Sequence, residues 1–146
     1  MKNEIITILN PIIQGFAYCL AIILGYHLRR LQERKRRIAL LVDELDKVFR
    51  PLLARIETQD ISPYEILHET YLDQLQCVDK YFDQVSKRRK EKLSIAWEKY
   101  LQRNPTQTYT FEYYYDRDDP EKRKILRDEA AMRIRNILKS VSVKWN

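Results

Sequence analysis

The residues best suited to metal chemistry in this sequence are a glutamate and a histidine three positions apart. Glu65 and His68 match the Glu-x-x-His motif of carboxylate-bridged metal bundles, whose two ligands share one helix face. Such a centre needs a second motif, but the only other histidine, His27, lies at the end of the N-terminal hydrophobic stretch. We therefore expect no metal and no other cofactor, and interpret His68 as the margin of a half-exposed helix face.

Nucleophilic and acid–base groups are present, but they lack the partners that catalysis requires. Cys77 has no histidine nearby in the sequence to act as its base. Asp43, Glu44 and Asp46 form a small acidic group, and on an amphipathic helix such a group is usually solvated. We therefore predict no catalytic residues. The alternative is an enzyme whose site is assembled from scattered polar groups.

The distribution of glycine excludes a further class of site. Gly15 and Gly25 are the only glycines among the 146 residues. Loops that cradle phosphates need glycines where backbone amides approach the ligand, so loops of the Walker and dinucleotide-binding types are excluded after residue 25. Glycine-poor sequence rich in Leu, Lys, Arg and Glu is typical of helices. The two cysteines, Cys19 and Cys77, fall in different environments and predict no disulfide.

The N-terminal region has the composition of a membrane anchor. Residues 5–26 carry no formal charge, and a helix of about 20 apolar residues spans the hydrocarbon core of a bilayer. Asn10 followed by Pro11 is typical of a helix start, and a helix beginning there would only just span. A cleaved signal peptide, an interfacial helix and a core helix of a soluble bundle are the alternatives. We predict a transmembrane anchor over residues 1–28.

A basic segment at residues 29–37 follows the anchor and holds most of the net charge of +6. The positive-inside rule places this segment in the cytoplasm and the N-terminus outside. We expect it to contact anionic lipid headgroups. The rest of the chain is nearly neutral, which argues against nucleic acid as a partner. The basic residues of the segment are Arg29, Arg30, Arg34, Lys35, Arg36 and Arg37.

Two further groups of residues predict contacts with partner proteins. Ala17, Ala21 and Gly25 recur every four positions, which lets two membrane helices approach closely, in a homo-oligomer or with another membrane protein. An aromatic segment near residue 110 suits a contact surface, because tyrosine buries area at low entropy cost. Packing of these rings onto the helices is the other interpretation. The aromatic residues are Tyr109, Phe111, Tyr113, Tyr114 and Tyr115.

Amphipathic periodicity predicts the first two helices of the remaining chain. An apolar stripe continues the anchor helix to about residue 57, with a kink or restart at Pro51. Ser62 and Pro63 then start a second helix, and Glu65 completes a capping box. The buried stripe of this helix runs to Val85.

A third helix over residues 93–101 and a fourth helix capped by Asp119 complete the predicted elements. Whether the third continues the second is open. Amphipathic helices bury their apolar faces against one another, so we predict an all-α protein with a small helical bundle over residues 38–141. Residues 142–146 form a tail.

Five short segments are landmarks of the sequence, namely Phe49-Arg50-Pro51, Tyr64-Glu65-Ile66-Leu67, Ala96-Trp97-Glu98-Lys99-Tyr100, Arg133-Ile134 and Ile137-Leu138. Together they resemble a group of small uncharacterised bacterial proteins that often carry an N-terminal membrane helix. The resemblance implies a bacterial source, and hence the inner (cytoplasmic) membrane, but no particular activity. We therefore expect a single-pass membrane protein whose cytoplasmic domain is an interaction or scaffold module. A membrane-tethered nucleic-acid-binding module is a second alternative.

Overall fold

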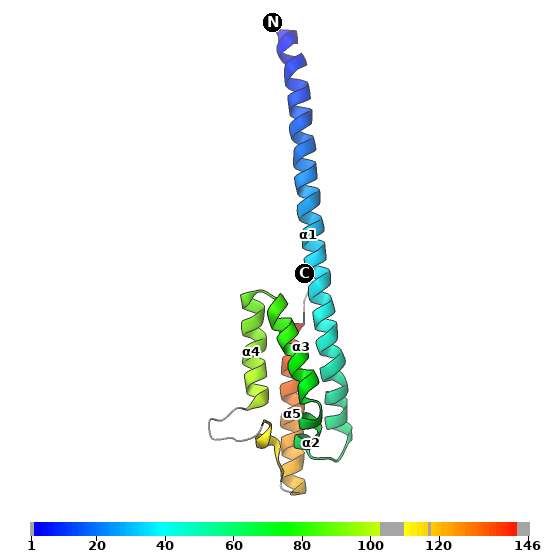
Figure 1. The fold of residues 1–146 in the computed structure, drawn as a ribbon, viewed down its shortest axis with the longest axis vertical. Coiled ribbons are helices and arrows are strands. Elements are labelled where there is room, and N and C mark those ends of the chain that lie inside the picture. The colour runs from blue at the N-terminus through cyan, green and yellow to red at the C-terminus, as the bar shows by residue number, and fades with distance from the viewer. Residues whose placement is uncertain (1, 103–109, 117, 143–146) are drawn as a thin grey trace. The chain divides into compact units, whose positions relative to one another are not determined.

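The computed structural model describes residues 2–102, 110–116 and 118–142, with side chains from residue 14 onward. Within these ranges the chain is helical and has no strand, which confirms the predicted all-α class (Figure 1). The chain divides into an N-terminal unit, Met1–Arg37, and a C-terminal unit, Ile38–Asn146. The elements are α1 (Lys2–Thr58), α2 (Pro63–Glu69), α3 (Tyr71–Gln84), α4 (Lys87–Leu101), the 3-10 turn η1 (Glu112–Tyr114) and α5 (Pro120–Val141).

Helix α1 is one uninterrupted helix that contains both of its prolines. The helix start that Asn10 and Pro11 would allow is not used, because α1 begins at Lys2, and the helix does not restart at Pro51. Pro51 is exposed, whereas Phe49, Leu52 and Ile56 beside it are almost completely buried. Burial of these side chains outweighs the one backbone hydrogen bond that proline removes, so the helix continues.

The second predicted helix is divided into α2 and α3 at Thr70, which ends α2 and precedes α3. The Thr70 hydroxyl donates to the carbonyl oxygen of Ile66 at 3.2 Å. The predicted capping box at Ser62 is wrong, because its side chain makes no capping hydrogen bond and its hydroxyl is buried without a described partner. The predicted helix cap at Asp119 is confirmed, since its carboxylate accepts hydrogen bonds from the amides of Glu121 and Lys122 at 3.0 and 3.2 Å.

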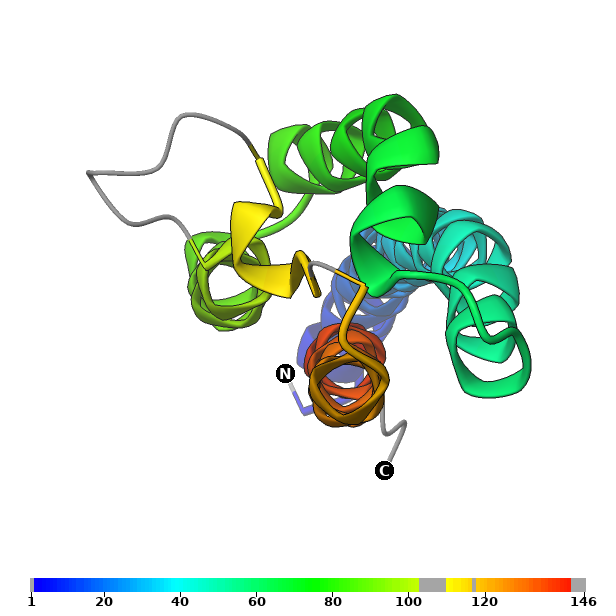
Figure 2. The ribbon, with the colours of Figure 1, turned by 90° about the horizontal axis from the view of Figure 1, so that it is seen from below.

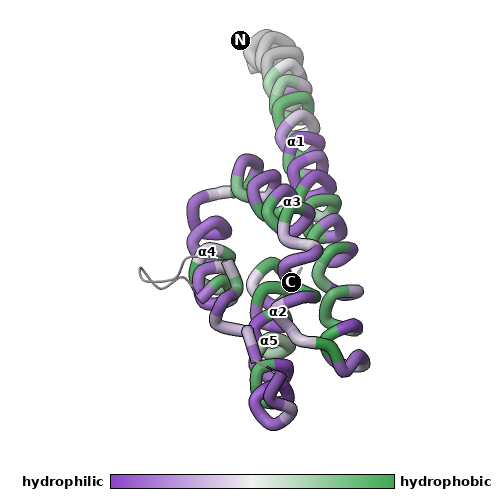
Figure 3. Tube along the Cα trace, turned by 60° about the horizontal axis from the view of Figure 1, so that its bottom comes forward, coloured by the Kyte–Doolittle hydropathy of each residue, from purple (hydrophilic) through white to green (hydrophobic). Residues whose placement is uncertain are grey.

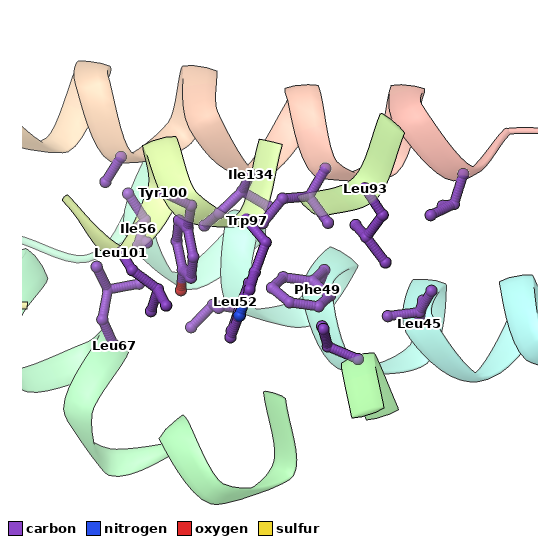
Figure 4. Packing of buried hydrophobic residues seen from close by; sticks show 14 of the residues in the cluster. Leu45, Phe49, Leu52, Ile56, Leu67, Leu93, Trp97, Tyr100, Leu101 and Ile134 are labelled. Carbon is purple, nitrogen blue, oxygen red and sulfur yellow. The ribbon is translucent and has the colours of Figure 1, made fainter. Parts of the chain in front are cut away.

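The core of the C-terminal unit lies between residues 38–58 of α1 and the helices α2 to α5 (Figure 2). Phe49 of α1 meets Tyr100 of α4 edge to face, with ring centroids 6.0 Å apart, and Trp97 lies against both (Figure 4). Buried aromatic pairs of this kind stabilise by about 0.5–1.5 kcal/mol beyond the area that they bury. The predicted apolar face of the last helix is also confirmed, because Leu126, Ile134 and Ile137 of α5 are buried.

Candidate functional site

The large apolar side chains of α1 between residues 14 and 28 are exposed. Among them Tyr18 is the most exposed, at 73%, and Leu20 is the least exposed, at 47%. Figure 3 shows hydrophobic residues in this part of α1 and hydrophilic residues further along it. The exposed large side chains here are Phe16, Tyr18, Leu20, Ile22, Ile23, Leu24, Tyr26 and Leu28.

Among the residues that the structure describes, no helix combines the length and the apolar character needed to cross a membrane. The spanning anchor therefore stays a prediction. Ala17, Ala21 and Gly25 are exposed in α1, and a Cβ atom added at Gly25 would meet no other atom within 4 Å. Contact through these small residues also stays a prediction.

The basic residues predicted to contact lipid headgroups all lie on α1 with exposed side chains. Arg29 pairs with Glu33 one turn later, at 3.4 Å between Nε and Oε1. Both side chains are mostly exposed, and such pairs contribute little to stability. The segment therefore presents an accessible positive surface, and its contact with lipid stays a prediction.

The structure divides the predicted aromatic surface into buried and exposed rings. Phe111 and Tyr114 are completely buried, which places both in the core. Tyr113 and Tyr115 remain 38% and 48% exposed, and contact of these two with a partner stays a prediction. Tyr109 lies outside the described residues.

A buried polar network, which the sequence analysis did not identify, connects α3, α4 and η1. The Tyr100 hydroxyl donates to Oε1 of Gln74 at 2.7 Å, and Nε2 of Gln74 donates to the carbonyl oxygen of Leu67 at 3.1 Å. The Tyr114 hydroxyl donates to the carbonyl oxygen of Tyr100 at 2.8 Å. Buried polar groups must find partners to offset their desolvation, and each of these three side chains finds one in a neighbouring element, either a side chain or a backbone carbonyl.

Arg133 of α5 extends this network and is 8% exposed. Its Nη1 donates to the carbonyl oxygen of Lys99 at 2.8 Å and to the Tyr114 hydroxyl at 3.3 Å, and its Nη2 donates to Glu129. The guanidinium carbon also lies 5.0 Å from the centroid of the Tyr113 ring. Arg133 occurs beside the apolar stripe of α5, so periodicity alone gave no reason to place a charge inside.

The buried phenols of the network are held in their protonated form. Burial raises the pKa of Tyr114 to about 12, although the Arg133 charge opposes the shift. Burial also raises the pKa of Tyr100 well above its ordinary value, with the neighbouring Tyr114 adding to the effect. Both hydroxyls therefore act as hydrogen-bond donors at neutral pH, and their role in the network is structural.

Cys77, the candidate nucleophile, is half-buried, and its thiol donates to the carbonyl oxygen of Gln74 at 3.1 Å. Burial raises the pKa of the thiol to about 12, although nearby backbone hydrogen bonds oppose the shift. The thiolate is the reactive form of cysteine, so this group is almost entirely unreactive at neutral pH. It lies in a groove of about 490 Å³ that is also lined by Glu44, Asp73 and Lys80.

The predicted acidic group on α1 is neutralised by neighbouring cations. Lys47 pairs with Asp43 at 2.6 Å, and Lys80 pairs with Glu44 at 2.7 Å. Arg50 donates two hydrogen bonds to Asp46, and these bonds hold the pKa of the Asp46 carboxyl below its usual value. These carboxylates are engaged in ion pairs at the surface.

The candidate metal ligand His68 is exposed and stacks on Tyr64, with ring centroids 5.5 Å apart. In the part of the chain that the structure describes, no three His, Cys, Asp or Glu side chains gather closely enough to hold a metal ion. Cys19 and Cys77 are both free thiols, as predicted.

Comparisons with known proteins add no relative to this geometry. No known protein family matches the chain. No curated protein and no solved structure matches it either. The resemblance to bacterial membrane proteins therefore stays a prediction.

Proposed function

We propose that the chain is a single-pass membrane protein whose C-terminal unit is an interaction or scaffold module at the cytoplasmic face. The observation that carries this proposal is the exposure of eight large apolar side chains between Phe16 and Leu28. Transfer of one such side chain from water into an apolar phase contributes about 1.5–3 kcal/mol. Eight of them together favour a lipid environment by more than about 10 kcal/mol.

The length of the uncharged run supports a spanning arrangement. Residues 5–26 form 22 positions without a formal charge, and α1 covers all of them. As a helix this run is about 33 Å long, and the hydrocarbon core of a bilayer is about 30 Å thick. The side chains of residues 5–13 lie outside the described residues, so this support comes from the sequence.

The charge that follows the run supports one orientation. Six of the nine residues 29–37 are basic, whereas Lys2 and Glu4 before the run cancel. Basic residues next to a membrane helix remain on the cytoplasmic side. The C-terminal unit would therefore face the cytoplasm, at the inner membrane of a bacterium if the resemblance of the sequence holds.

The state of the reactive groups supports binding over catalysis. The thiol of Cys77 and the phenols of Tyr100 and Tyr114 are protonated at neutral pH, and Asp43, Glu44 and Asp46 are in ion pairs. A catalytic group needs a pKa near the working pH.

The partner would be a second copy of the chain or another membrane protein, which would contact the anchor through Ala17, Ala21 and Gly25.

Replacement of Leu20 and Ile23 together with arginine tests the anchor. Each charge near the centre of a bilayer costs about 3 kcal/mol, so we expect the double variant to move from the membrane to the soluble fraction. Partition is measured by carbonate extraction and ultracentrifugation of cells that produce the full chain.

The matched control replaces Leu72 and Ile125 with arginine. These side chains are 70% and 66% exposed in the C-terminal unit, so the same change of charge should leave the chain in the membrane. Circular dichroism melting verifies that each variant is folded. Equal partition of the native chain and the Leu20/Ile23 variant would rule out the anchor.

A further inference from the structure

A second candidate site lies within the C-terminal unit, where α4 begins and α5 ends. A pocket of about 500 Å³ opens there, and its lining contains four basic side chains, three serines and no carboxylate. Arg89 and Ser140 are half-buried in it. The lining consists of Ser86, Arg88, Arg89 and Lys92 around the start of α4, and Lys139, Ser140 and Ser142 at the end of α5.

The charge of this pocket is not balanced, although the arginines elsewhere in the unit are paired. Every other described arginine of the C-terminal unit forms an ion pair with a carboxylate, namely Arg50, Arg55, Arg123, Arg127, Arg133 and Arg135. Among the described residues, Arg88 and Arg89 form no ion pair. Four cations around one pocket repel one another, and a bound anion relieves that repulsion.

The backbone at the start of α4 adds donors to the same pocket. The first turn of α4 has no acidic residue, whereas the first turns of α2, α3 and α5 contain Glu65, Asp73 and Glu121. Ser86 precedes α4 but its side chain makes no capping hydrogen bond. The amides of Arg89 and Lys90 already donate to the carbonyl oxygen of Ser86. The amides that lack a partner within the helix, and so favour an anion, are those of Lys87 and Arg88. An anion in the pocket would therefore meet amide, hydroxyl and guanidinium donors together.

We propose that this pocket binds the phosphate group of an anionic lipid headgroup. The guanidinium of arginine matches two phosphate oxygens at once, and serine hydroxyls and helix amides are common additional donors. The volume of about 500 Å³ exceeds that of one phosphate and leaves room for the rest of a headgroup. The choice of a lipid as the molecule that carries this phosphate rests on the proposed function.

The position of the pocket along the chain supports a ligand at the membrane surface. The start of α4 lies at the same end of the C-terminal unit as the first turns of α1 that belong to this unit (Figure 1). Only nine residues, 29–37, separate the predicted anchor, residues 1–28, from Ile38. Nine residues reach about 14 Å as a helix and about 30 Å when fully extended, so the anchor keeps this end close to the headgroups.

A nucleic acid is the other large anion that such a pocket could meet. Binding to a phosphate backbone needs a continuous basic surface. Outside this pocket the C-terminal unit has 16 basic and 19 acidic residues, so its net charge is negative, and its described arginines are paired, as with Arg50 and Arg135. A single confined pocket fits one headgroup better than a polymer.

The test uses the full chain in nanodiscs of phosphatidylcholine, with increasing fractions of phosphatidylglycerol. Hydrogen exchange of the backbone amides of residues 86–92 reports on occupation of the pocket. We expect phosphatidylglycerol to slow this exchange in the native chain. The double variant Arg88→Gln and Arg89→Gln should need more phosphatidylglycerol to reach the same protection. We expect about a tenfold increase for each arginine lost, because each substitution removes a charge-assisted hydrogen bond.

The matched control, Lys122→Gln with Lys124→Gln, removes two exposed charges from the start of α5, at the opposite end of the unit. It should behave as the native chain does. The proposal is overturned if phosphatidylglycerol gives no protection, or if it protects the Arg88/Arg89 variant equally. The lipid assignment is overturned if phosphatidylglycerol gives no protection while inorganic phosphate or a single-stranded oligonucleotide, added to discs of phosphatidylcholine alone, does protect residues 86–92.

Failure of the anchor and failure of the pocket give different results. If the chain is released by carbonate without any substitution, the anchor is wrong, and the exchange experiment is then run on the released chain with phosphatidylglycerol vesicles. Protection of residues 86–92 under those conditions still supports the pocket. If the chain stays in the membrane but residues 86–92 are never protected, the anchor stands and the pocket is wrong.

Discussion

At the scale of single residues, burial decides which polar groups are able to react. Cys77 and Tyr100 belong to reactive residue types, but burial raises the pKa of both groups. The sequence predicted no catalytic role for Cys77, because it has no histidine nearby. It did not predict the partner of that thiol, since the Gln74 carbonyl becomes an acceptor only through the local geometry of α3.

The thiol of Cys77 should react slowly in the native protein. Its pKa is about 12 against an ordinary value of 9.0, so the thiolate fraction at neutral pH falls about a thousandfold. In a Cys19→Ser background we expect reaction with a water-soluble disulfide reagent to be at least about a hundredfold slower in the folded chain than in urea. The rate should rise about tenfold for each pH unit below that pKa.

A chain with both cysteines replaced by serine and Leu72 by cysteine is the control for this measurement. Leu72 is 70% exposed on the same helix, so the new thiol should react equally fast with and without urea. Rapid labelling of Cys77 in the native chain would show that the thiol is accessible and ionised, and would reopen the enzyme alternative.

At the scale of elements, the sequence predicted which segments are helical better than it predicted where they end. Asp119 was recognised because an acidic cap directly before proline is a strong local signal. Thr70 was not recognised as a break, because the apolar stripe of α2 and α3 continues across it. Local signals fix an element only where tertiary packing does not compete, and at Pro51 packing prevails.

Replacement of Pro51 by alanine should stabilise the C-terminal unit by about 2 kcal/mol. Proline inside a helix costs about 3 kcal/mol relative to alanine, and the more flexible unfolded chain takes back up to about 1 kcal/mol. The Pro51 side chain is exposed, so no packing is lost. Urea denaturation of the full chain in detergent, followed by tryptophan fluorescence, measures the change.

Pro63→Ala is the companion variant, because Pro63 lies at the first position of α2 and is buried. Proline is favoured there, so this variant should gain no stability. A loss of stability in Pro51→Ala would mean that α1 needs a proline at that point, and the account of its uninterrupted course would be wrong.

At the scale of the whole molecule, patterns of apolar residues were enough to predict an all-α protein and most of its core. Leu45, Phe49 and Ile134 were each placed in the core by helical periodicity and are completely buried. The basic pocket was not predicted, because Arg88 and Lys139 are 51 positions apart in the sequence and only the fold brings them together.

The hydrogen bonds among Gln74, Tyr100 and Tyr114 also have a consequence for folding. Amphipathic helices can bury their apolar stripes in several alternative arrangements, but an arrangement that separates these side chains leaves dry, unpaired polar atoms. We infer that this small network selects one packing of the bundle. Replacement of Gln74 by leucine and of Tyr100 and Tyr114 by phenylalanine should keep the helices and the melting temperature, yet give more than one amide NMR signal for many residues. A single sharp set of signals would show that shape alone makes the core unique.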